Sequence, residues 1–158
     1  MSNKLNKILT EYYPKIFKTC FGYTRTLEDA NDLTQEVLIR IWKGYASFKG
    51  DSTLNTWIYR ITVNSCLMFI RKNKKQVLVD INTLNHLHHE NQNIDQEEID
   101  ELYKHIAQLN EKDRLVIILY LEELTYDEIA DIIGISTNYV GVKINRIKKI
   151  LSAKIKNV

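Results

Sequence analysis

Apolar residues recur at intervals of three and four along most of this chain, which is the period of helices with one buried face. Two helices separated by a tight turn are predicted between residues 124 and 151. Thr125 and Glu128 at the start of the first form a capping box, in which each side chain accepts a hydrogen bond from the other residue's backbone amide. Gly134 is expected to end this helix, because glycine adopts the left-handed conformation at little cost.

The second of these helices has two faces of different character. Ser136 is expected to cap it, and apolar residues then recur after four, three and four residues, namely Val140, Ile144, Ile147 and Leu151. The opposite face carries Asn138, Tyr139, Lys143, Asn145, Arg146 and Lys149. A scaffold helix followed by a polar, basic helix is the arrangement of a DNA-reading helix-turn-helix, although an ordinary amphipathic helix pair has the same pattern. The six basic and no acidic residues of residues 137–158 favour phosphate binding.

The first 75 residues are expected to fold as a unit of three or four helices. The first covers residues 3–21, with a break near Tyr13 because Pro14 lacks a backbone donor. The second follows its N-cap Thr26, and its apolar pattern runs from Ala30 through Leu33, Val37, Leu38 and Ile41 to Trp42. The third is expected to begin at the cap Ser52 and to end in a basic cluster, Arg71, Lys72, Lys74 and Lys75.

The remainder of the chain is predicted to form a linker and a second helical unit. Residues 76–96 have no sustained period and are rich in Asn, Gln and His, as is typical of a flexible linker. Two helices, at about 97–109 and, after the cap Asn110, at 111–121, precede the helix-turn-helix. The predicted fold is therefore all-α, with two small helical domains, residues 1–75 and 97–158, joined by a flexible linker.

Charge and composition narrow the class of protein. The 158 residues carry a net charge of only +2, but residues 90–101 are acidic while the end of the chain is basic, which suggests a separate nucleic-acid face. A single Pro and five Gly agree with a helical fold. Neither a membrane-length apolar run nor a secretion signal is present, so a cytoplasmic protein without membrane insertion is expected. Cys20 and Cys66 are expected to be reduced core thiols rather than a redox pair.

Few residues suggest catalysis or metal binding. His86, His88, His89 and Glu90 have some of the right chemistry for a metal, but they lie in a polar segment without a supporting second shell, so a solvated linker is the preferred interpretation. A glycine-rich phosphate loop, a catalytic triad and a carboxylate pair cannot be assembled. We therefore expect neither a metal, nor a cofactor, nor enzymatic activity.

The segment 48–64 has a different chemistry, suited to single-stranded nucleic acid. It combines an aromatic residue, a basic residue and small polar residues in a loop and on a helix, followed by the basic Arg71. Unstacked bases bind aromatic rings and offer their pairing edges to such groups. Trp57, Ile58 and Ile61 are expected in the core, because they lie on the apolar stripe, whereas Arg60 and Asn64 are better candidates for contacts.

The two predicted domains together resemble the extracytoplasmic-function sigma factors of bacterial RNA polymerase. The resemblance rests on DANDLTQEVLIRIWK (29–43), FKGDSTLNTWIYRITVN (48–64), and LNEKDRLVIILYLEELTYDEIADIIGIS (109–136) with VKINRIKKIL (142–151). It implies that residues 1–75 form sigma domain 2, which binds the polymerase clamp coiled coil and captures the melted minus-ten element. Residues 97–158 would be sigma domain 4, which meets the polymerase flap and reads the minus-thirty-five element as duplex.

The resemblance also assigns roles to individual residues. The polymerase-binding residues would be Asp32, Leu33, Gln35, Glu36 and Ile39. The melted strand would meet Phe48, Lys49, Asp51, Asn55, Arg60, Asn64 and Arg71. The upstream duplex would meet Ser136, Asn138, Tyr139, Gly141, Val142, Lys143, Asn145, Arg146 and Lys149. The chain departs from the common family pattern at Asn138-Tyr139 and Gly141-Val142, and a close approach of backbone to DNA would explain a glycine that costs about 1 kcal/mol of helix propensity.

The expected function is promoter-specific initiation by core RNA polymerase on promoter DNA, under control of an anti-sigma partner that covers the region of Leu33 and Ile39. Three other interpretations stay open at this point. A stand-alone helix-turn-helix repressor or activator would bind a palindromic duplex without polymerase. An adaptor of the anti-sigma type would leave the basic face unused, and a metal-dependent hydrolase would rest on the histidines alone.

Overall fold

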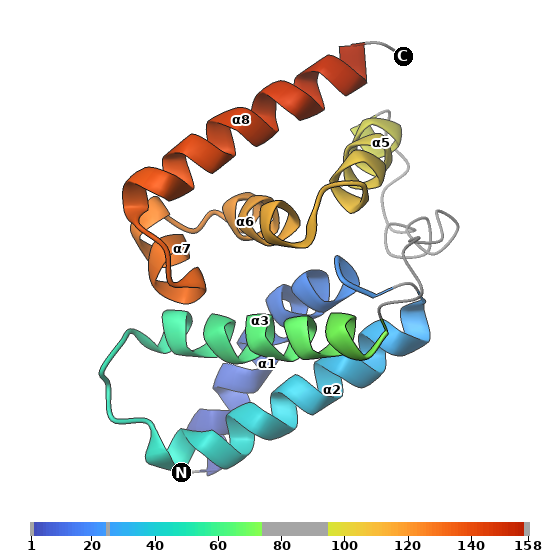
Figure 1. Ribbon diagram of the computed structural model, residues 1–158. Helices are drawn as coiled ribbons and strands as arrows, with labels where there is room; N and C mark the ends of the chain where they lie inside the picture. Colours follow the sequence, from blue (N-terminus) through green and yellow to red (C-terminus); the bar gives the residue numbers. More distant parts are fainter. Residues whose placement is uncertain (1, 25, 74–94, 157–158) are drawn as a thin grey trace. The chain divides into compact units, whose positions relative to one another are not determined.

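The computed structural model describes residues 2–24, 26–73 and 95–156, and Figure 1 shows it as a ribbon. Within these residues every regular element is a helix. The chain divides into two compact units, Met1–Gln76 and Val77–Val158, hereafter unit 1 and unit 2. The predicted all-α fold of two small helical domains is confirmed, while residues 76–94 of the predicted linker, including His86, His88 and His89, lie outside the described residues.

Unit 1 is built from three long helices that all pack against one another. These are α1 (Ser2–Phe21), α2 (Leu27–Gly44) and α3 (Leu54–Lys72), with a short 3-10 turn, η1 (Tyr45–Ser47), after α2. Their apolar stripes meet in a core that includes the fully buried Ile16, Val37, Ile41, Ile58 and Val63. The predicted N-cap of α2 is confirmed, because the hydroxyl of Thr26 accepts a hydrogen bond from the Asp29 amide at 3.0 Å.

Two predictions for unit 1 were wrong. The break near Tyr13 does not occur, since α1 continues through Pro14. Proline removes one backbone hydrogen bond, but the following turns bury Ile16 and Cys20 against α2 and α3, and tertiary packing outweighs the local preference. The cap of α3 is Thr53 rather than Ser52, because it is the Thr53 hydroxyl that accepts from the Thr56 amide, at 3.1 Å.

The two cysteines are buried core thiols, as predicted. Cys20 on α1 and Cys66 on α3 are fully buried and free of disulfide bonds. Burial raises the pKa of the Cys66 thiol well above its usual value, and a hydrogen bond with Cys20 raises it further. Both effects keep Cys66 protonated and unreactive near neutral pH.

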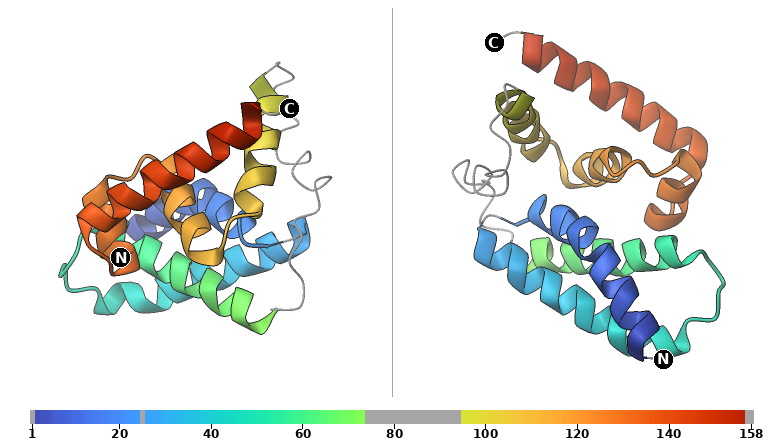
Figure 2. Two further views of the ribbon diagram at one scale, coloured as in Figure 1. Left: turned by 45° about the horizontal axis from the view of Figure 1, so that its top comes forward. Right: turned by 180° about the vertical axis from the view of Figure 1, so that it is seen from behind.

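Unit 2 is organised around its last helix. Its described residues form the helices α5 (Asp95–Ala107), α6 (Glu111–Leu121), α7 (Tyr126–Ile133) and α8 (Thr137–Lys156). Each of the first three packs against α8, and the views in Figure 2 show α7 and α8 joined by a tight turn. The side chains buried on α8 are the predicted Val140, Ile144, Ile147 and Leu151.

Local hydrogen bonds explain where the helices of unit 2 begin and end. Asn110 accepts from the Asp113 amide at 2.9 Å and caps α6, and both bonds of the predicted capping box of Thr125 and Glu128 are present. Gly134 ends α7 with a φ of 81°. The side chains buried on α7 are Ile129, Ala130 and Ile132.

Glu123, between α6 and α7, has a φ of 64°, which is unfavourable for a residue with a Cβ atom. We expect Glu123→Gly to raise the free energy of unfolding by about 0.5–1 kcal/mol, because relief of the strain exceeds the extra entropy of glycine in the unfolded chain. Urea denaturation measures this difference. Glu123→Ala is the matched control, since it removes the same side chain but keeps the Cβ atom, and an equal gain from alanine would contradict the explanation.

Among the described helices, none combines the length and the apolar character that crossing a bilayer requires. The same described residues contain no group of three or more His, Cys, Asp or Glu side chains arranged to hold a metal ion.

Candidate nucleic-acid interface

The outer surface of α8 is a regular stripe of four exposed side chains. Asn138, Val142, Asn145 and Lys149 follow one another after four, three and four residues, on the side of the helix opposite its buried stripe. Val142 is 62% exposed, although it is apolar. The start of the helix is fixed by Ser136, whose hydroxyl accepts from the Tyr139 amide at 3.1 Å, as the sequence predicted.

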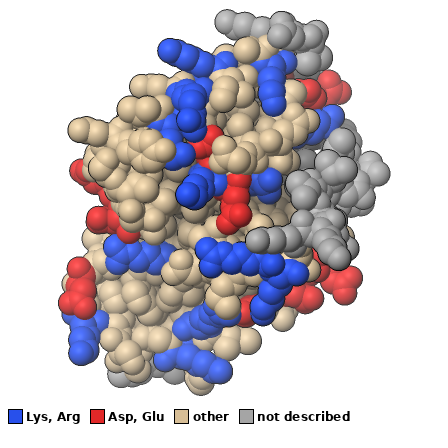
Figure 3. All heavy atoms as spheres, viewed as in Figure 1, with Lys and Arg blue, Asp and Glu red and all other residues tan. Residues whose placement is uncertain are grey.

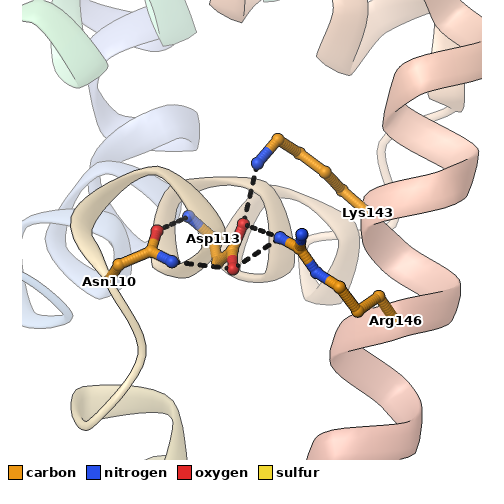
Figure 4. Close-up of polar contacts among 4 residues, drawn as sticks. All are labelled: Asn110, Asp113, Lys143 and Arg146. Atoms are coloured by element: carbon orange, nitrogen blue, oxygen red, sulfur yellow. Dashed lines mark hydrogen bonds and ion pairs between the residues drawn. The ribbon is translucent and has the colours of Figure 1, made fainter.

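Lys143 was expected on the exposed face of α8, and this prediction was wrong. Its side chain is only 9% exposed, and its Nζ donates to Oδ1 of the buried Asp113 on α6 at 2.8 Å (Figure 4). The ammonium also lies 5.0 Å from the centroid of the Tyr139 ring. Sequence periodicity alone could not place it, because its position borders the buried stripe and its partner lies 30 residues away.

Arg146 shares the same carboxylate. Its Nη2 donates to both oxygens of Asp113 at 2.9 and 2.8 Å, while the side chain stays 52% exposed (Figure 4). Asn110 completes the cluster by donating to Oδ2 of Asp113 at 2.9 Å. Burial would raise the pKa of Asp113, but the hydrogen bonds from Lys143 and Asn110 and the charges of Lys143 and Arg146 outweigh it, so the pKa is lowered.

Gly141 lies next to a side chain of α7 within unit 2. A Cβ atom built there would lie 3.4 Å from Cε2 of Tyr126 on α7, so the close approach is to a neighbouring side chain of the same unit. This distance is at the edge of ordinary van der Waals contact. Packing within unit 2 therefore does not require a glycine at this position, and the approach of its backbone to DNA stays a prediction.

We accordingly expect Gly141→Ala to stabilise the protein by about 0.5–1 kcal/mol, because alanine restores helix propensity and its methyl group fits against Tyr126. Thermal unfolding followed by circular dichroism measures the change. If Gly141→Ala instead destabilises while the double variant Gly141→Ala/Tyr126→Ala does not, the space beside Tyr126 is smaller than ordinary contact allows.

A second polar surface lies on α3. Arg60, Asn64 and Arg71 are four and seven residues apart and so share the face opposite the buried Thr62 and Cys66. Asn64 and Arg71 are exposed and Arg60 is half-buried. The helix C-terminus, with Arg71 in its last turn, thus continues a polar strip that begins at Arg60.

Phe48 and Asn55 are less available for contacts with nucleic acid than the sequence suggested. The Phe48 ring packs on Trp57, with centroids 5.0 Å apart, and Trp57 in turn contacts the backbone at Gly44 closely. Lys49 and Asp51 project from the loop. Asn55 faces α1, where its Oδ1 accepts from the Tyr12 hydroxyl at 3.0 Å, so it does not share the face of Asn64.

The third surface is the exposed face of α2, where Asp32, Gln35, Glu36 and Ile39 lie together. Leu33 does not join them, because it is only 3% exposed and packs in the core, so its expected place in an exposed patch was wrong. The structure adds Trp42, which is 59% exposed seven residues after Gln35. As part of the apolar pattern of this helix, Trp42 was expected in the core, although its spacing of three from Ile39 could have placed it on the outer face.

Basic side chains gather on α8, whereas carboxylates lie on the exposed face of α2. Figure 3 shows Lys and Arg side chains along α8, whose described side chains include five basic and no acidic residues. On α2 the exposed face carries carboxylates beside Ile39 and Trp42, and Glu36 is paired with Arg40 one turn later. A polar and basic α8 after a short capped α7 makes unit 2 a helix-turn-helix of a DNA-binding protein.

Comparison with known families defines the class more closely. The Sigma-70 region 2 model matches residues 8–76, and the Sigma-70, region 4 model matches residues 99–151, so the two matches coincide with unit 1 and unit 2. The chain belongs to the extracytoplasmic-function (ECF) sigma factors, a family that binds RNA polymerase and directs promoter-specific transcription initiation.

Individual relatives agree with this assignment. The chain is 27% identical to RNA polymerase sigma factor YlaC of Bacillus subtilis, over 91% of this chain and 87% of the relative, and 27% identical to ECF RNA polymerase sigma factor SigW of the same organism, over 96% and 88%. The structure of sigma factor RpoE in complex with the anti-sigma factor NepR from Bartonella quintana has the same fold, with a TM-score of 0.77 and 18% identity over 97% of each chain. CnrH in complex with the cytosolic domain of CnrY gives a TM-score of 0.76 at 17% identity, over 99% of this chain and 90% of that one.

Proposed function

We propose that the three surfaces, two on unit 1 and one on unit 2, each bind a different component of the promoter complex. The exposed stripe of α8 reads the upstream element as duplex, the polar strip on α3 holds the melted downstream strand, and the outer face of α2 binds core polymerase. The observation that carries this proposal is the α8 stripe, because four exposed side chains of hydrogen-bonding, apolar and basic character follow one line on the side of the helix opposite its buried stripe.

Lys149 is suited to phosphate contact at the upstream duplex. It is exposed at the end of the stripe, and a cation there releases counterions when it neutralises a phosphate. Lys143 and Arg146 are less suited to a direct role, because both are engaged by Asp113. Ser136 caps α8, and Tyr139 borders the stripe, 46% exposed.

Single-stranded DNA requires groups that reach both bases and backbone. Asn64 offers an amide to a base edge, and Arg60 and Arg71 flank it with positive charge on the same face of α3. Lys49 and Asp51 of the preceding loop are exposed near the start of this helix. Phe48 and Asn55 act by positioning, since they contact Trp57 and Tyr12.

Polymerase binding is assigned to Asp32, Gln35, Glu36, Ile39 and Trp42. A carboxylate and amide face around an exposed tryptophan has the composition of a binding hot spot, in which an aromatic anchor is surrounded by polar groups. We also expect an anti-sigma partner, because sigma factor RpoE of Bartonella quintana is in complex with one. Such a partner would cover exposed apolar groups such as Ile39 and Trp42, in the cytoplasm where polymerase acts.

The salt dependence of promoter binding tests the assignment of the α8 stripe. Holoenzyme would be assembled from core RNA polymerase and the full chain, and its affinity for a promoter duplex measured across a series of salt concentrations. Lys149→Ala is expected to reduce the slope of log K against log salt by about 0.9, the value for one phosphate. Lys148→Ala is the matched control, because the neighbouring Lys148 ammonium donates to the Tyr120 hydroxyl at 2.7 Å instead. Equal slopes for both variants would reject the stripe as the duplex-reading surface.

A further inference from the structure

The side chains at the middle of the α8 stripe combine amide and apolar chemistry. Two amides, Asn138 and Asn145, lie on either side of Val142, and all three are exposed. Seven residues of α-helix span about 10 Å, which equals the rise of about three base pairs of duplex DNA. All three side chains can therefore reach the same stretch of about three base pairs in the major groove.

The major groove distinguishes base pairs by what their edges offer. Adenine presents an N7 acceptor beside an N6 donor, which an asparagine amide pairs with through two hydrogen bonds, and thymine presents a C5 methyl group that an apolar side chain contacts. Guanine presents O6 and N7 acceptors, which arginine or lysine bind. Amides and a valine therefore match A·T pairs rather than G·C pairs.

Two basic side chains that border the middle of this stripe are held elsewhere, whereas Lys149 is exposed at its end. Lys143 is 9% exposed with its ammonium on Asp113, and Arg146 uses Nη2 on both oxygens of the same carboxylate (Figure 4). A guanine contact by Lys143 would require this buried, charge-assisted cluster to open, and so would a bidentate contact through both Nη atoms of Arg146. Reading of guanine by Lys143 and Arg146, beside Val142 and Asn145, is thus disfavoured by contacts inside unit 2, independently of the chemistry of the stripe.

From these two observations we infer that α8 selects an upstream element with a block of A·T pairs, in which Asn138 and Asn145 bind adenine edges and Val142 contacts a thymine methyl group. The inference rests on the proposed function, since it names the bases that the same stripe would read. It makes Asn138, Val142 and Asn145 the residues that determine specificity, while Lys149 supplies affinity without sequence preference.

Transcription from a promoter library tests the preference. Holoenzyme made from core polymerase and the full chain would transcribe templates with a randomised upstream duplex, and the transcripts would be sequenced. A block of about three A·T pairs is expected to be enriched, with a G·C pair at a contacted position reducing output about tenfold. Asn145→Ala should relax the preference at one position, whereas Ser152→Ala, an exposed change further along α8, should leave it unaltered.

Modified bases then test each contact. Deoxyuridine in place of thymine removes only the methyl group and is expected to lower output about fourfold with the native chain but not with Val142→Ala. 7-deaza-adenine removes the N7 acceptor and should have no further effect in the asparagine variant that has lost that contact. Because all three side chains are exposed and alanine favours the helix, the variants are expected to fold.

The outcomes separate this inference from the proposed function. Enrichment of G·C pairs in the block, or an equal response of the native chain and Val142→Ala to deoxyuridine, would overturn the A·T preference and leave duplex reading by unit 2 intact. Transcription that is indifferent to the whole upstream duplex would overturn both.

Discussion

Replacement of Asp113 by asparagine is expected to lower the free energy of unfolding of unit 2 by about 3 kcal/mol. The change leaves the nearly buried Lys143 ammonium without its anionic partner, and breaking one side of a buried ion pair is much more costly than losing an exposed one. The hydrogen bonds from Arg146 to the same carboxylate would be weakened as well. Hydrogen exchange measured by mass spectrometry on peptides of α6 and α8 reports this stability for unit 2 alone.

Two further variants make the Asp113 prediction specific. Asp127→Asn is the same chemical change at an exposed carboxylate that accepts from the Thr137 hydroxyl at 2.8 Å, and it is expected to cost less than about 0.5 kcal/mol. Lys143→Met in the Asp113→Asn background removes the buried unpaired charge and should recover much of the lost stability. A cost for Asp113→Asn no greater than that of Asp127→Asn would show that the cluster does not stabilise α8.

The same cluster predicts how stability depends on pH. The pKa of Asp113 is lower in the folded protein than in the unfolded chain, because hydrogen bonds and positive charges outweigh burial. Its ionised form therefore contributes fully above the ordinary carboxyl pKa of about 4, and the contribution is lost as the pH falls through the lower folded value. The stability difference between the native chain and Asp113→Asn should accordingly be constant near neutral pH and shrink below about pH 4.

Trp42→Ala is expected to weaken binding of the full chain to core RNA polymerase about 100-fold. A tryptophan that is 59% exposed on a face with Gln35 and Ile39 contributes little to folding but is the residue type that most often anchors an interface. Competition binding with a fluorescent chain measures the affinity. Tyr13→Ala, at a residue 43% exposed on α1, is the matched control for the loss of an exposed aromatic side chain. If both variants bind as tightly as the native chain, the outer face of α2 is not the polymerase contact.

Much of the fold could be predicted because local chemistry determines it. Helix period, the caps Thr26, Asn110 and Thr125, and Gly134 act over three or four residues, and each is confirmed in the structure. Pro14 shows the limit of local reasoning, since contacts of α1 with two other helices maintain a helix that the isolated segment would break.

Errors in the candidate sites arose where a side chain lies at the border between two faces. Leu33 and Trp42 are both apolar residues of α2, and only the arrangement of three helices decides that the first is buried and the second exposed. Lys143 was placed outside because lysine is seldom buried, whereas a carboxylate on another helix holds it inside. That partner, Asp113, could not be recognised from spacing, because nothing local distinguishes it from other acidic residues at a helix start.

Run-off transcription tests most directly whether the chain directs initiation by core RNA polymerase. Core RNA polymerase would be incubated with promoter templates from the selected library, with and without the full chain, and the 5′ ends of the transcripts mapped. The proposed division of work predicts initiation at one position that depends on the added chain, is lost with Trp42→Ala, and is reduced on templates whose upstream block is changed to G·C pairs. Initiation of equal yield and position without the chain would contradict it.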